Sequence, residues 1–452
     1  MADLTHTPSK GVAVVGGGLA GSEAAWQLAG AGISVTLYEM KPERFSPAHT
    51  SPLLGELVCS NSLRSEEPQT AVGLLKEEMA AAGSLVMEAA AATRVPAGKA
   101  LAVDRERFAA HITGRIHSHP LITVARAEVR GLDDPCLEGF SHIVLTPGPL
   151  AGESLTASIM ERVGSSQLYF YDAIAPIVQA DSIDMGKVFW GSRYRPGDRD
   201  YLNCPMTEEQ YHVFREALLA GKTVPCRDFE KEIHFEGCLP VETLAQRGPL
   251  TMAYGPLKPV GLEDPRTGRR PFAVVQLRAE NLEKTMFNLV GFQTKLTYPE
   301  QKRIFCIIPG LEQAEFFRLG SIHRNTYVNA PEVLTPELEI KAAPGFFLAG
   351  QISGVEGYVE SASCGLWVGL HLAGKLCGVK VPPPPLETAL GALLGHLRTP
   401  VKNFQPMNAN FGLTPPLGAR AGKKRRKELY AERGRMARES WLFSVREVLS
   451  GP

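Results

Sequence analysis

The region between residues 11 and 40 restricts the fold more than any other part of the chain. Its pattern predicts a strand over residues 12–15, a glycine-rich turn, a helix over residues 22–29 and a second strand over residues 33–38. The turn reads GxGxxG and lies directly between the first strand and the helix. This βαβ order is typical of a Rossmann-type dinucleotide-binding domain.

The glycines of this turn have separate physical tasks. Gly16 permits a tight turn, Gly18 lets the backbone approach a pyrophosphate, and Gly21 lets the helix pack closely on the strand. The helix N-terminus presents N–H groups to the phosphates, and a carboxylate after the second strand is expected to accept hydrogen bonds from the adenosine ribose. A glycine turn without a ligand is the alternative. The expected cofactor-binding residues are Gly16, Gly17, Gly18, Leu19, Ala20, Gly21 and Glu39.

A second glycine-rich segment distinguishes FAD from NAD. The sequence FFLAGQISGVEGYVES precedes an Ala-, Gly- and Leu-rich stretch that predicts a helix to about residue 376. It resembles the second flavin motif of glutathione-reductase-like FAD proteins, in which a strand ends in Ala-Gly, here Ala349 and Gly350. Gln351 stands where many of those proteins carry Asp. The resemblance implies FAD bound in part by Gly350 and Gln351, and an ordinary strand-to-helix turn is the alternative.

The middle of the chain differs in character from both ends. Between about residues 169 and 291, short β-like runs alternate with Pro- and Gly-rich turns, which predicts a mixed sheet inserted into the first domain. Residues 70–92 predict one long helix or two, with Gly83 as the break. We expect an α/β protein with a split, glutathione-reductase-type Rossmann FAD-binding domain and an inserted mixed α/β domain. The expected boundaries are 1–165 and 325–452 for the FAD-binding domain and 166–324 for the insertion.

Composition excludes several classes of protein. The 452 residues include 48 basic and 48 acidic side chains, so no overall charge attracts the protein to nucleic acid or to a membrane. No apolar run is long enough to span a bilayer and the first residues lack the apolar core of a signal peptide, so a cytoplasmic protein is expected. The eight cysteines contain no CxxC pair, which argues against a disulfide framework and a metal site.

Short segments spread along the chain are similar to a family of tRNA-modifying flavoproteins. They include AGSEAAWQLA, LYEMKP, ELVCSNSLRS, VPAGKALAVDRERF, FEGCLPVE, GPLKPVGLEDPRTG and HRNTYVNAP. On these segments the chain is identified as a member of the methylenetetrahydrofolate–tRNA-(uracil-5-)-methyltransferase family, a relative of the GidA family. One departure is Thr146-Pro147-Gly148-Pro149-Leu150, where the family usually has Ala-Thr-Gly-Pro-Leu.

The resemblance implies an enzyme that forms 5-methyluridine at position 54, in the T-loop of tRNA. It implies methylenetetrahydrofolate as carbon donor, FAD as cofactor and NADPH or NADH as reductant, with no obligatory protein partner. The first alternative is a GidA-like enzyme that makes carboxymethylaminomethyluridine in the anticodon and needs a partner GTPase. The second is a flavin-containing tRNA-binding chaperone without methyl transfer.

The chemistry requires a cysteine, because carbon 5 of uracil is a poor nucleophile until a thiolate adds at carbon 6. The resemblance gives this role to Cys238, in FEGCLP, and places Cys59, in VCSNS, at the flavin for proton abstraction or for protection of a reactive adduct. The division of roles between these two is left open. Four other cysteines are expected to be buried small hydrophobes: Cys136, Cys226, Cys306 and Cys377.

The flat pterin of folate calls for an aromatic or imidazole ring against its face. The resemblance implies a histidine, for which His323 in SIHRNTY and His49 in PAHT are the candidates, with His323 preferred over His49. A surface or structural histidine is the alternative. Tyr358 is expected at the start of the helix that faces the flavin, where its ring would stabilise a cationic intermediate. A core tyrosine is the alternative there.

A basic run near the C-terminus is the candidate tRNA surface. Between residues 420 and 439 nine residues are basic and three are acidic, a local net charge of +6. Such a run neutralises phosphates by counterion release, with a solvated helix end as the alternative. The target base is expected to leave its stack and enter a pocket near the flavin. The residues expected to contact tRNA are Lys423, Lys424, Arg425, Arg426 and Lys427.

Overall fold

Five parallel strands form the sheet that carries the glycine-rich turn. The computed structural model describes residues 11–164, 168–195, 197–225, 239–418 and 422–450. The strand order is β16-β7-β1-β2-β6, with β1 (Val12–Val15), β2 (Val35–Glu39), β6 (Ile122–Arg126), β7 (His142–Leu145) and β16 (Phe346–Leu348). Strand β1 is buried throughout, as a central parallel strand should be. Because β16 comes late in the sequence yet pairs with β7, the first domain is split as predicted.

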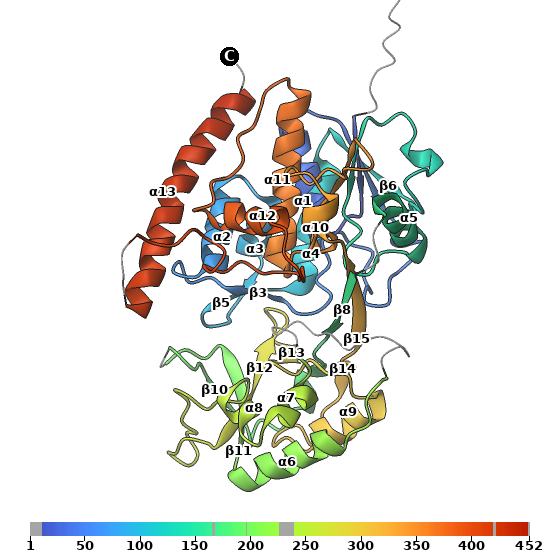
Figure 1. Cartoon of the computed structure of the whole chain (residues 1–452). Helices are drawn as coiled ribbons and strands as arrows, with labels where there is room; N and C mark the ends of the chain where they lie inside the picture. Colours follow the sequence, from blue (N-terminus) through green and yellow to red (C-terminus); the bar gives the residue numbers. More distant parts are fainter. Residues whose placement is uncertain (1–10, 165–167, 196, 226–238, 419–421, 451–452) are drawn as a thin grey trace, which may run out of the picture.

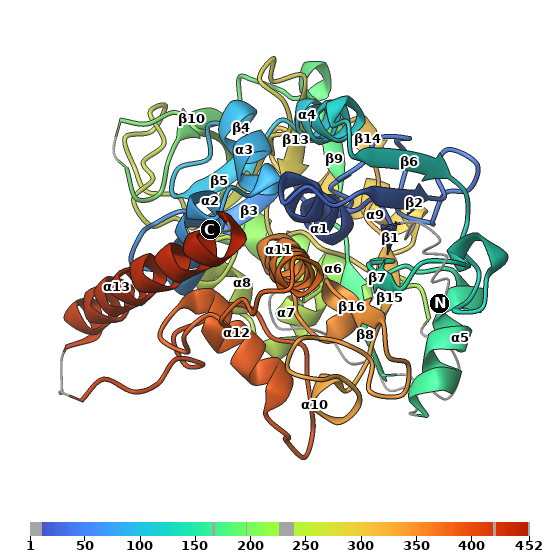
Figure 2. The same ribbon diagram turned by 90° about the horizontal axis from the view of Figure 1, so that it is seen from above.

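Helices α1 (Leu19–Gly30) and α11 (Tyr358–Leu376) pack against each other over this sheet (Figures 1 and 2). A Cβ atom on Gly365 would lie 2.0 Å from the carbonyl oxygen of Ala20, so only glycine allows the two backbones to come this close. Each helix begins directly after one of the two glycine-rich segments. The packing of these helices therefore brings both segments to one region of the sheet edge.

The other helices of this part surround α1 and α11. They are α2 (Ala71–Ala81), α3 (Leu85–Ala92), α4 (Arg105–Ser118), α5 (Glu153–Val163), α10 (Ala330–Val333), α12 (Ala389–Arg398) and α13 (Lys423–Ser450). Gly83 has a φ of 76° between α2 and α3, and Ser84 caps α3, so the predicted break is confirmed. A small antiparallel sheet has the order β3-β5-β4, with β3 (Ser62–Ser65), β5 (Ala100–Val103) and β4 (Arg94–Val95).

The lower part in Figure 1 has a sheet of its own. Its order is β10-β11-β12-β13-β9-β14, with β10 (Phe189–Gly191), β11 (Tyr201–Met206), β12 (Ala273–Ala279), β13 (Met286–Leu289), β9 (Ile177–Gln179) and β14 (Phe316–Arg318). The helices are α6 (Glu208–Ala220), α7 (Val241–Arg247), α8 (Thr251–Tyr254) and α9 (Tyr298–Phe305). The inserted α/β domain is confirmed, but every pairing between the described strands is antiparallel, so the expectation of a mixed sheet is wrong.

Two long strands run between the upper and lower parts (Figure 1). They are β8 (Leu168–Ala173) and β15 (Ile322–Tyr327), which pair antiparallel with His323 opposite Asp172. Three short 3₁₀ helices complete the described elements: Pro135–Leu137, Ala180–Ser182 and Gln351–Ser353. Within the described ranges, no helix combines the length and the apolar character needed to cross a membrane.

Candidate functional site

The GxGxxG turn is shaped by close contacts that exclude side chains. Gly16 has a φ of 104°, and a Cβ there would lie 2.3 Å from the carbonyl oxygen of Thr146. A Cβ on Gly21 would lie 1.8 Å from the carbonyl oxygen of Gly16. A Cβ on Gly18 would meet no protein atom within 4 Å, so its glycine leaves space on the pocket side. The turn therefore packs tightly against the protein at two glycines and is open at the third.

Glu39 at the end of β2 is buried and holds this turn in place. Its carboxylate accepts hydrogen bonds from the N–H groups of Gly17 and Lys41, each at 2.9 Å. Glu39 also lines the pocket, and a carboxylate has lone pairs left for additional donors. Its predicted contact with a ribose stays a prediction.

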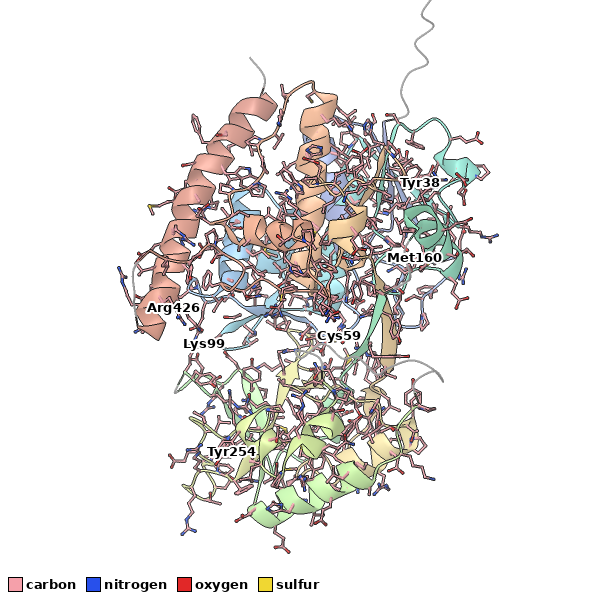
Figure 3. The ribbon with its side chains drawn as sticks, in the orientation of Figure 1. Tyr38, Cys59, Lys99, Met160, Tyr254 and Arg426 are labelled. Carbon is pink, nitrogen blue, oxygen red and sulfur yellow. The ribbon has the colours of Figure 1, made fainter. Side chains whose placement is uncertain are left out.

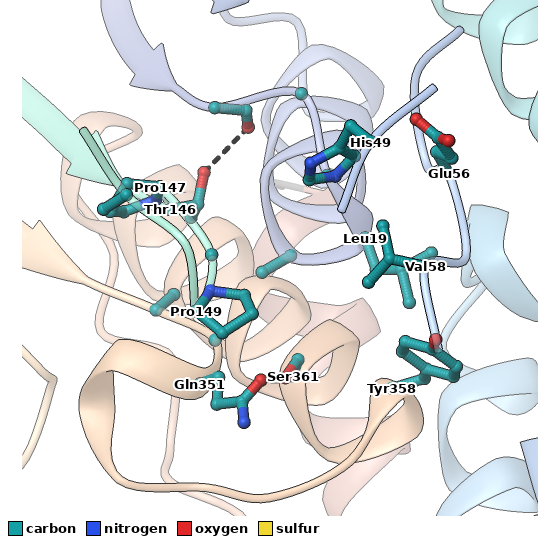
Figure 4. Close-up of a pocket in the computed structure, with 18 of the residues that line it drawn as sticks. Leu19, His49, Glu56, Val58, Thr146, Pro147, Pro149, Gln351, Tyr358 and Ser361 are labelled. Carbon is teal, nitrogen blue, oxygen red and sulfur yellow. Dashed lines mark hydrogen bonds between the residues drawn. The ribbon is translucent and has the colours of Figure 1, made fainter. Parts of the chain in front are cut away.

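A single pocket of about 400 Å³ brings the two glycine-rich segments together. Gly16–Ala20 line it on one side, and Gly350, Gln351 and Tyr358 line it on another. Figure 4 shows Thr146, Pro147 and Pro149 on the wall opposite His49 and Val58. Neither α1 nor α11 has a side-chain cap at its N-terminus, so the first N–H groups of both helices remain available near the pocket. A pocket of this volume suits a cofactor.

Residues 146–149, in the segment that departs from the family pattern, line this wall of the pocket. The Thr146 hydroxyl donates to the carbonyl oxygens of Val15 and Gly16, both at 2.9 Å. The prolines that follow, Pro147 and Pro149, line the pocket. Thr146 therefore ties the end of β7 to the glycine turn.

Cys59 and Tyr358 meet at the pocket wall from distant parts of the sequence. The backbone N–H groups of Cys59 and Ser60 donate to the Tyr358 hydroxyl at 2.7 and 3.2 Å. The thiol of Cys59 lies 3.8 Å from the carbonyl oxygen of Ala173. Burial raises the pKa of the Tyr358 phenol, so it stays protonated. Tyr358 thus fixes the Cys59 backbone to the start of α11.

Charged side chains from the lower part surround the same loop. Arg318 of β14 donates to the carbonyl oxygen of Cys59 at 3.3 Å, and Arg278 of β12 donates to the Ser60 hydroxyl at 2.7 Å. Burial is the main cause that raises the pKa of the Cys59 thiol; the negative charge of Asp172 raises it further, and the positive charge of Arg318 lowers it. Figure 3 shows Cys59 at the level where the upper and lower parts meet. Side chains of the inserted domain therefore hold the Cys59 loop in place and affect the pKa of the Cys59 thiol.

Alkylation of Cys59 by iodoacetamide is expected to be slow at neutral pH and to accelerate about tenfold per pH unit up to about pH 10. The thiolate attacks the methylene carbon of the reagent and displaces iodide, and burial raises the pKa of this thiol, so little thiolate is present at neutral pH. The variant Arg318→Gln loses a nearby positive charge, so its Cys59 is expected to react more slowly at every pH. Mass spectrometry of the Cys59 peptide measures the rate. A plateau below about pH 8 would show that the thiolate is instead stabilised.

The two candidate histidines lie near each other. Burial is the main cause that lowers the pKa of His323, and the charge of Arg318 and that of His49 in its protonated form lower it further. Burial and then Lys41 lower the pKa of His49, which lines the pocket (Figure 4). Both rings are therefore neutral at pH 7. His49 lies on the pocket wall, while His323 is not one of its described lining residues and forms a 2.8 Å hydrogen bond with Ser321.

The other cysteines fall into different environments. Cys238 and Cys226 lie outside the described residues, so the role predicted for Cys238 stays a prediction. Cys136 and Cys306 are half-buried. Cys377 follows α11 directly and is exposed, so its expected burial is wrong. Among the described residues, no group of His, Cys, Asp or Glu is arranged to hold a metal ion.

Within the basic run near the C-terminus, residues 423–439 lie on α13, and some of their arginines are used to pack this helix against the rest of the protein. Trp441 is buried against the core, and its indole donates to the carbonyl oxygen of Pro382 at 2.8 Å. Arg435 pairs with Glu77 at 2.8 Å, and Arg433 donates to the carbonyl oxygen of Pro416 at 3.1 Å. Lys424, Arg425, Arg426 and Lys427 are exposed, and nothing is described for the side chain of Lys423.

Sequence patterns missed several residues of this site. Asp172, Arg318 and Arg105 come from separate strands and a helix, and their charges act on Cys59 together. Glu356 lines the pocket, accepts a 2.8 Å hydrogen bond from Gln351 and has a raised pKa because it is buried next to Asp172. No local motif joins these residues, since only the fold brings them together.

Comparison with known proteins shows the family of this chain. The family described as Glucose inhibited division protein A matches residues 11–380. A protein of Oleidesulfovibrio alaskensis named Methylenetetrahydrofolate--tRNA-(uracil-5-)-methyltransferase TrmFO is 66% identical over 95% of this chain and 96% of its own length. A protein of the same name from Geobacter sulfurreducens is 59% identical over 96% of this chain and 99% of its own length.

Solved structures support the fold. Aquifex aeolicus GidA is 17% identical, with a TM-score of 0.68 over 96% of this chain and 74% of that chain. The fold and the pocket define a Rossmann-type protein of the GidA class. Within that class, the chain belongs to the TrmFO family of methylenetetrahydrofolate–tRNA-(uracil-5-)-methyltransferases. The resemblance found in the sequence is therefore confirmed.

Proposed function

We propose that the chain is a methylenetetrahydrofolate–tRNA-(uracil-5-)-methyltransferase that forms 5-methyluridine at position 54 in the T-loop. The observation that carries the proposal is the 66% identity over 95% of the chain to a relative named as a methylenetetrahydrofolate–tRNA-(uracil-5-)-methyltransferase. The position in the T-loop is what the family resemblance implies. The similarity to a GidA structure is far weaker, at 17% identity, which favours this activity over GidA-like modification of the anticodon. A tRNA substrate implies the cytoplasm as the site of action.

The described residues fit FAD in the pocket. The space beside Gly18 and the uncapped N-termini of α1 and α11 suit a pyrophosphate, because backbone N–H groups and helix dipoles favour negative charge. When bound, FAD supplies the electrons that reduce the folate-derived carbon to a methyl group, and NADPH or NADH restores them. We assign binding to eight residues that line the pocket and to Gly21, which packs against Gly16 and is not one of the described lining residues; the eight are Gly16, Gly17, Gly18, Leu19, Ala20, Glu39, Gly350 and Gln351.

Two cysteines and a tyrosine carry the proposed chemistry. The thiolate of Cys238 adds to carbon 6 of uracil, which makes carbon 5 nucleophilic. Cys59 removes the proton from carbon 5, or protects the reactive carbon before transfer. Tyr358 holds the Cys59 backbone through its hydroxyl, and its ring is available to a cation at the pocket wall. Arg318 and Arg105 lower the pKa of Cys59 against the effect of burial.

Folate and tRNA approach this centre by separate surfaces. A neutral His49 or His323 ring stacks on the pterin, and the position of His49 on the pocket wall now favours that residue. The basic residues at the start of α13 contact tRNA phosphates: Lys423, together with the exposed Lys424, Arg425, Arg426 and Lys427. The enzyme acts without an obligatory protein partner.

Nucleoside analysis separates this function from the two alternatives. Purified protein is incubated with an unmodified tRNA transcript, methylenetetrahydrofolate and NADPH, and the digested RNA is examined by mass spectrometry. The expected product is 5-methyluridine that maps to the T-loop and is absent without folate. Carboxymethylaminomethyluridine, formed only with an added GTPase, would instead indicate the GidA-like activity. Binding of tRNA without any modified base would indicate a chaperone.

A further inference from the structure

A second groove lies between the start of α2 and the first turns of α13. It has a volume of about 570 Å³. Its walls come from four parts of the chain: residues 64–65, 69–72 and 409–412, and on α13 residues 426, 427 and 430. Figure 3 shows Arg426 at the lower end of α13. The groove therefore begins at the basic run and extends toward the body of the FAD-binding domain.

The charged side chains that line this groove are all positive. Arg64, Arg426 and Lys427 line it, and none of the described lining residues is acidic. Arg64 forms a 2.9 Å ion pair with the buried Glu360. Arg426 and Lys427 are exposed, and within the described part of the chain neither forms an ion pair. Two uncompensated positive charges at a groove favour an anionic ligand.

Aromatic rings form part of the same wall. The rings of Phe411 and Tyr430 stack with their centroids 5.2 Å apart and an interplanar angle of 14°. The Arg433 guanidinium lies 5.3 Å from the centre of the Tyr430 ring and steadies it from another side. Cations beside a stacked aromatic pair form the combination that binds single-stranded nucleic acid, since phosphates meet the cations and bases stack on the rings.

The groove continues toward the cofactor pocket. Arg64 lines both cavities. Asn408 lines the pocket, and its neighbour Ala409 lines the groove and donates its N–H to Glu360 at 2.9 Å. A strand lying in the groove would therefore reach the pocket at Arg64.

We propose that this groove binds the tRNA strand next to the target uridine. Arg426 and Lys427 contact its phosphates, a base stacks against the Phe411–Tyr430 pair, and Arg64 marks the point where the flipped uridine turns into the pocket. This inference rests on the proposed function. Neighbouring basic residues therefore have different surroundings. Arg425 pairs with Glu428 and Glu432 on the surface, whereas Arg426 and Lys427 line the groove.

The double variant Arg426→Ala/Lys427→Ala tests the phosphate contacts. We expect its KM for tRNA to rise at least about tenfold, and the slope of log affinity against log salt to fall by about 1.4 to 1.8, the loss of two phosphate contacts. The matched control is Arg269→Ala/Arg270→Ala, which removes the same charge from exposed positions of the inserted domain. That control is expected to match the wild type in KM for tRNA and in salt slope.

A second pair of variants tests stacking without a change of charge. Tyr430→Ala is expected to raise the KM for tRNA about tenfold, while Tyr430→Phe keeps the ring and stays within about twofold of the wild type. Photocrosslinking with 4-thiouridine next to the target uridine is expected to label peptides that contain Phe411 or Tyr430.

Three other outcomes of these experiments would contradict either the groove proposal or the proposed function. An active wild type whose groove variants keep the wild-type KM for tRNA and salt slope would overturn the groove proposal alone. A KM raised for methylenetetrahydrofolate but not for tRNA would overturn it in favour of the anionic folate tail. If the wild type forms no 5-methyluridine, the proposed function fails, and the Kd for tRNA of the same variants still decides whether the groove binds RNA.

Discussion

Replacing Cys59 with alanine is expected to slow 5-methyluridine formation by a factor of about 10² to 10⁴, the usual contribution of one proton-transfer group. The variant is expected to retain its flavin. The thiol makes one weak contact, to the carbonyl oxygen of Ala173, and the backbone N–H of residue 59 still donates to the Tyr358 hydroxyl. The initial rate with saturating tRNA and folate, measured together with the flavin content, checks both halves of this prediction.

The matched control is Cys306→Ala, which removes a half-buried thiol from the inserted domain and is expected to retain the wild-type rate. A tRNA containing 5-fluorouridine separates the two cysteines. Its covalent adduct is expected with Cys59→Ala and not with Cys238→Ala, since the adduct needs the thiolate that attacks carbon 6. Full activity of Cys59→Ala would remove this residue from the proposed chemistry.

The variant Gly21→Ala is expected to purify with less than about a tenth of the wild-type flavin and with stability lowered by about 1–3 kcal/mol. The added methyl group would lie 1.8 Å from the carbonyl oxygen of Gly16 and 2.5 Å from the Thr146 hydroxyl. Relieving these contacts requires α1 to move away from β1, which displaces the N–H groups that face the pocket. Flavin absorbance per protein and the Tm of the apoprotein are the measurements.

Two other glycines serve as controls for this variant. Gly30 lies at the exposed end of α1, and a Cβ added there would meet no atom within 4 Å. The variant Gly30→Ala is therefore expected to change neither the flavin content nor the Tm. Gly18→Ala also meets no protein atom, so it should leave the Tm of the apoprotein unchanged and weaken FAD binding alone. A Gly21→Ala protein with full flavin content would contradict the geometry of the turn.

The sequence predicted the local parts of the fold well. The βαβ unit, the break at Gly83 and the strand–turn–helix around Gly350 each depend on a short pattern of glycines and apolar residues. Strand direction in the inserted domain was not predictable in this way, because short apolar runs show which segments are strands and not how they pair. The antiparallel order β10-β11-β12-β13-β9-β14 emerges only from the tertiary structure.

Sequence motifs pointed to several residues that the structure places on the pocket wall, but not to residues that only the fold brings together. Glu39 and Gln351 follow from motifs, whereas Asp172 and Arg318 approach Cys59 from separate strands. The basic run shows a further limit. Its net charge does not reveal that Arg435 pairs with Glu77 in the packing of α13, because the face that packs depends on residues far away in the sequence.

The source of the methyl carbon tests the central claim most directly. The protein is incubated with unmodified tRNA, NADPH, methylenetetrahydrofolate labelled with carbon-13 in its methylene group, and unlabelled S-adenosylmethionine. The expected result is 5-methyluridine that carries the label and is absent when folate is omitted. An unlabelled methyl group, or no methylated uridine from a protein that retains its flavin and binds tRNA, would contradict the assignment of this chain as a folate-dependent methyltransferase.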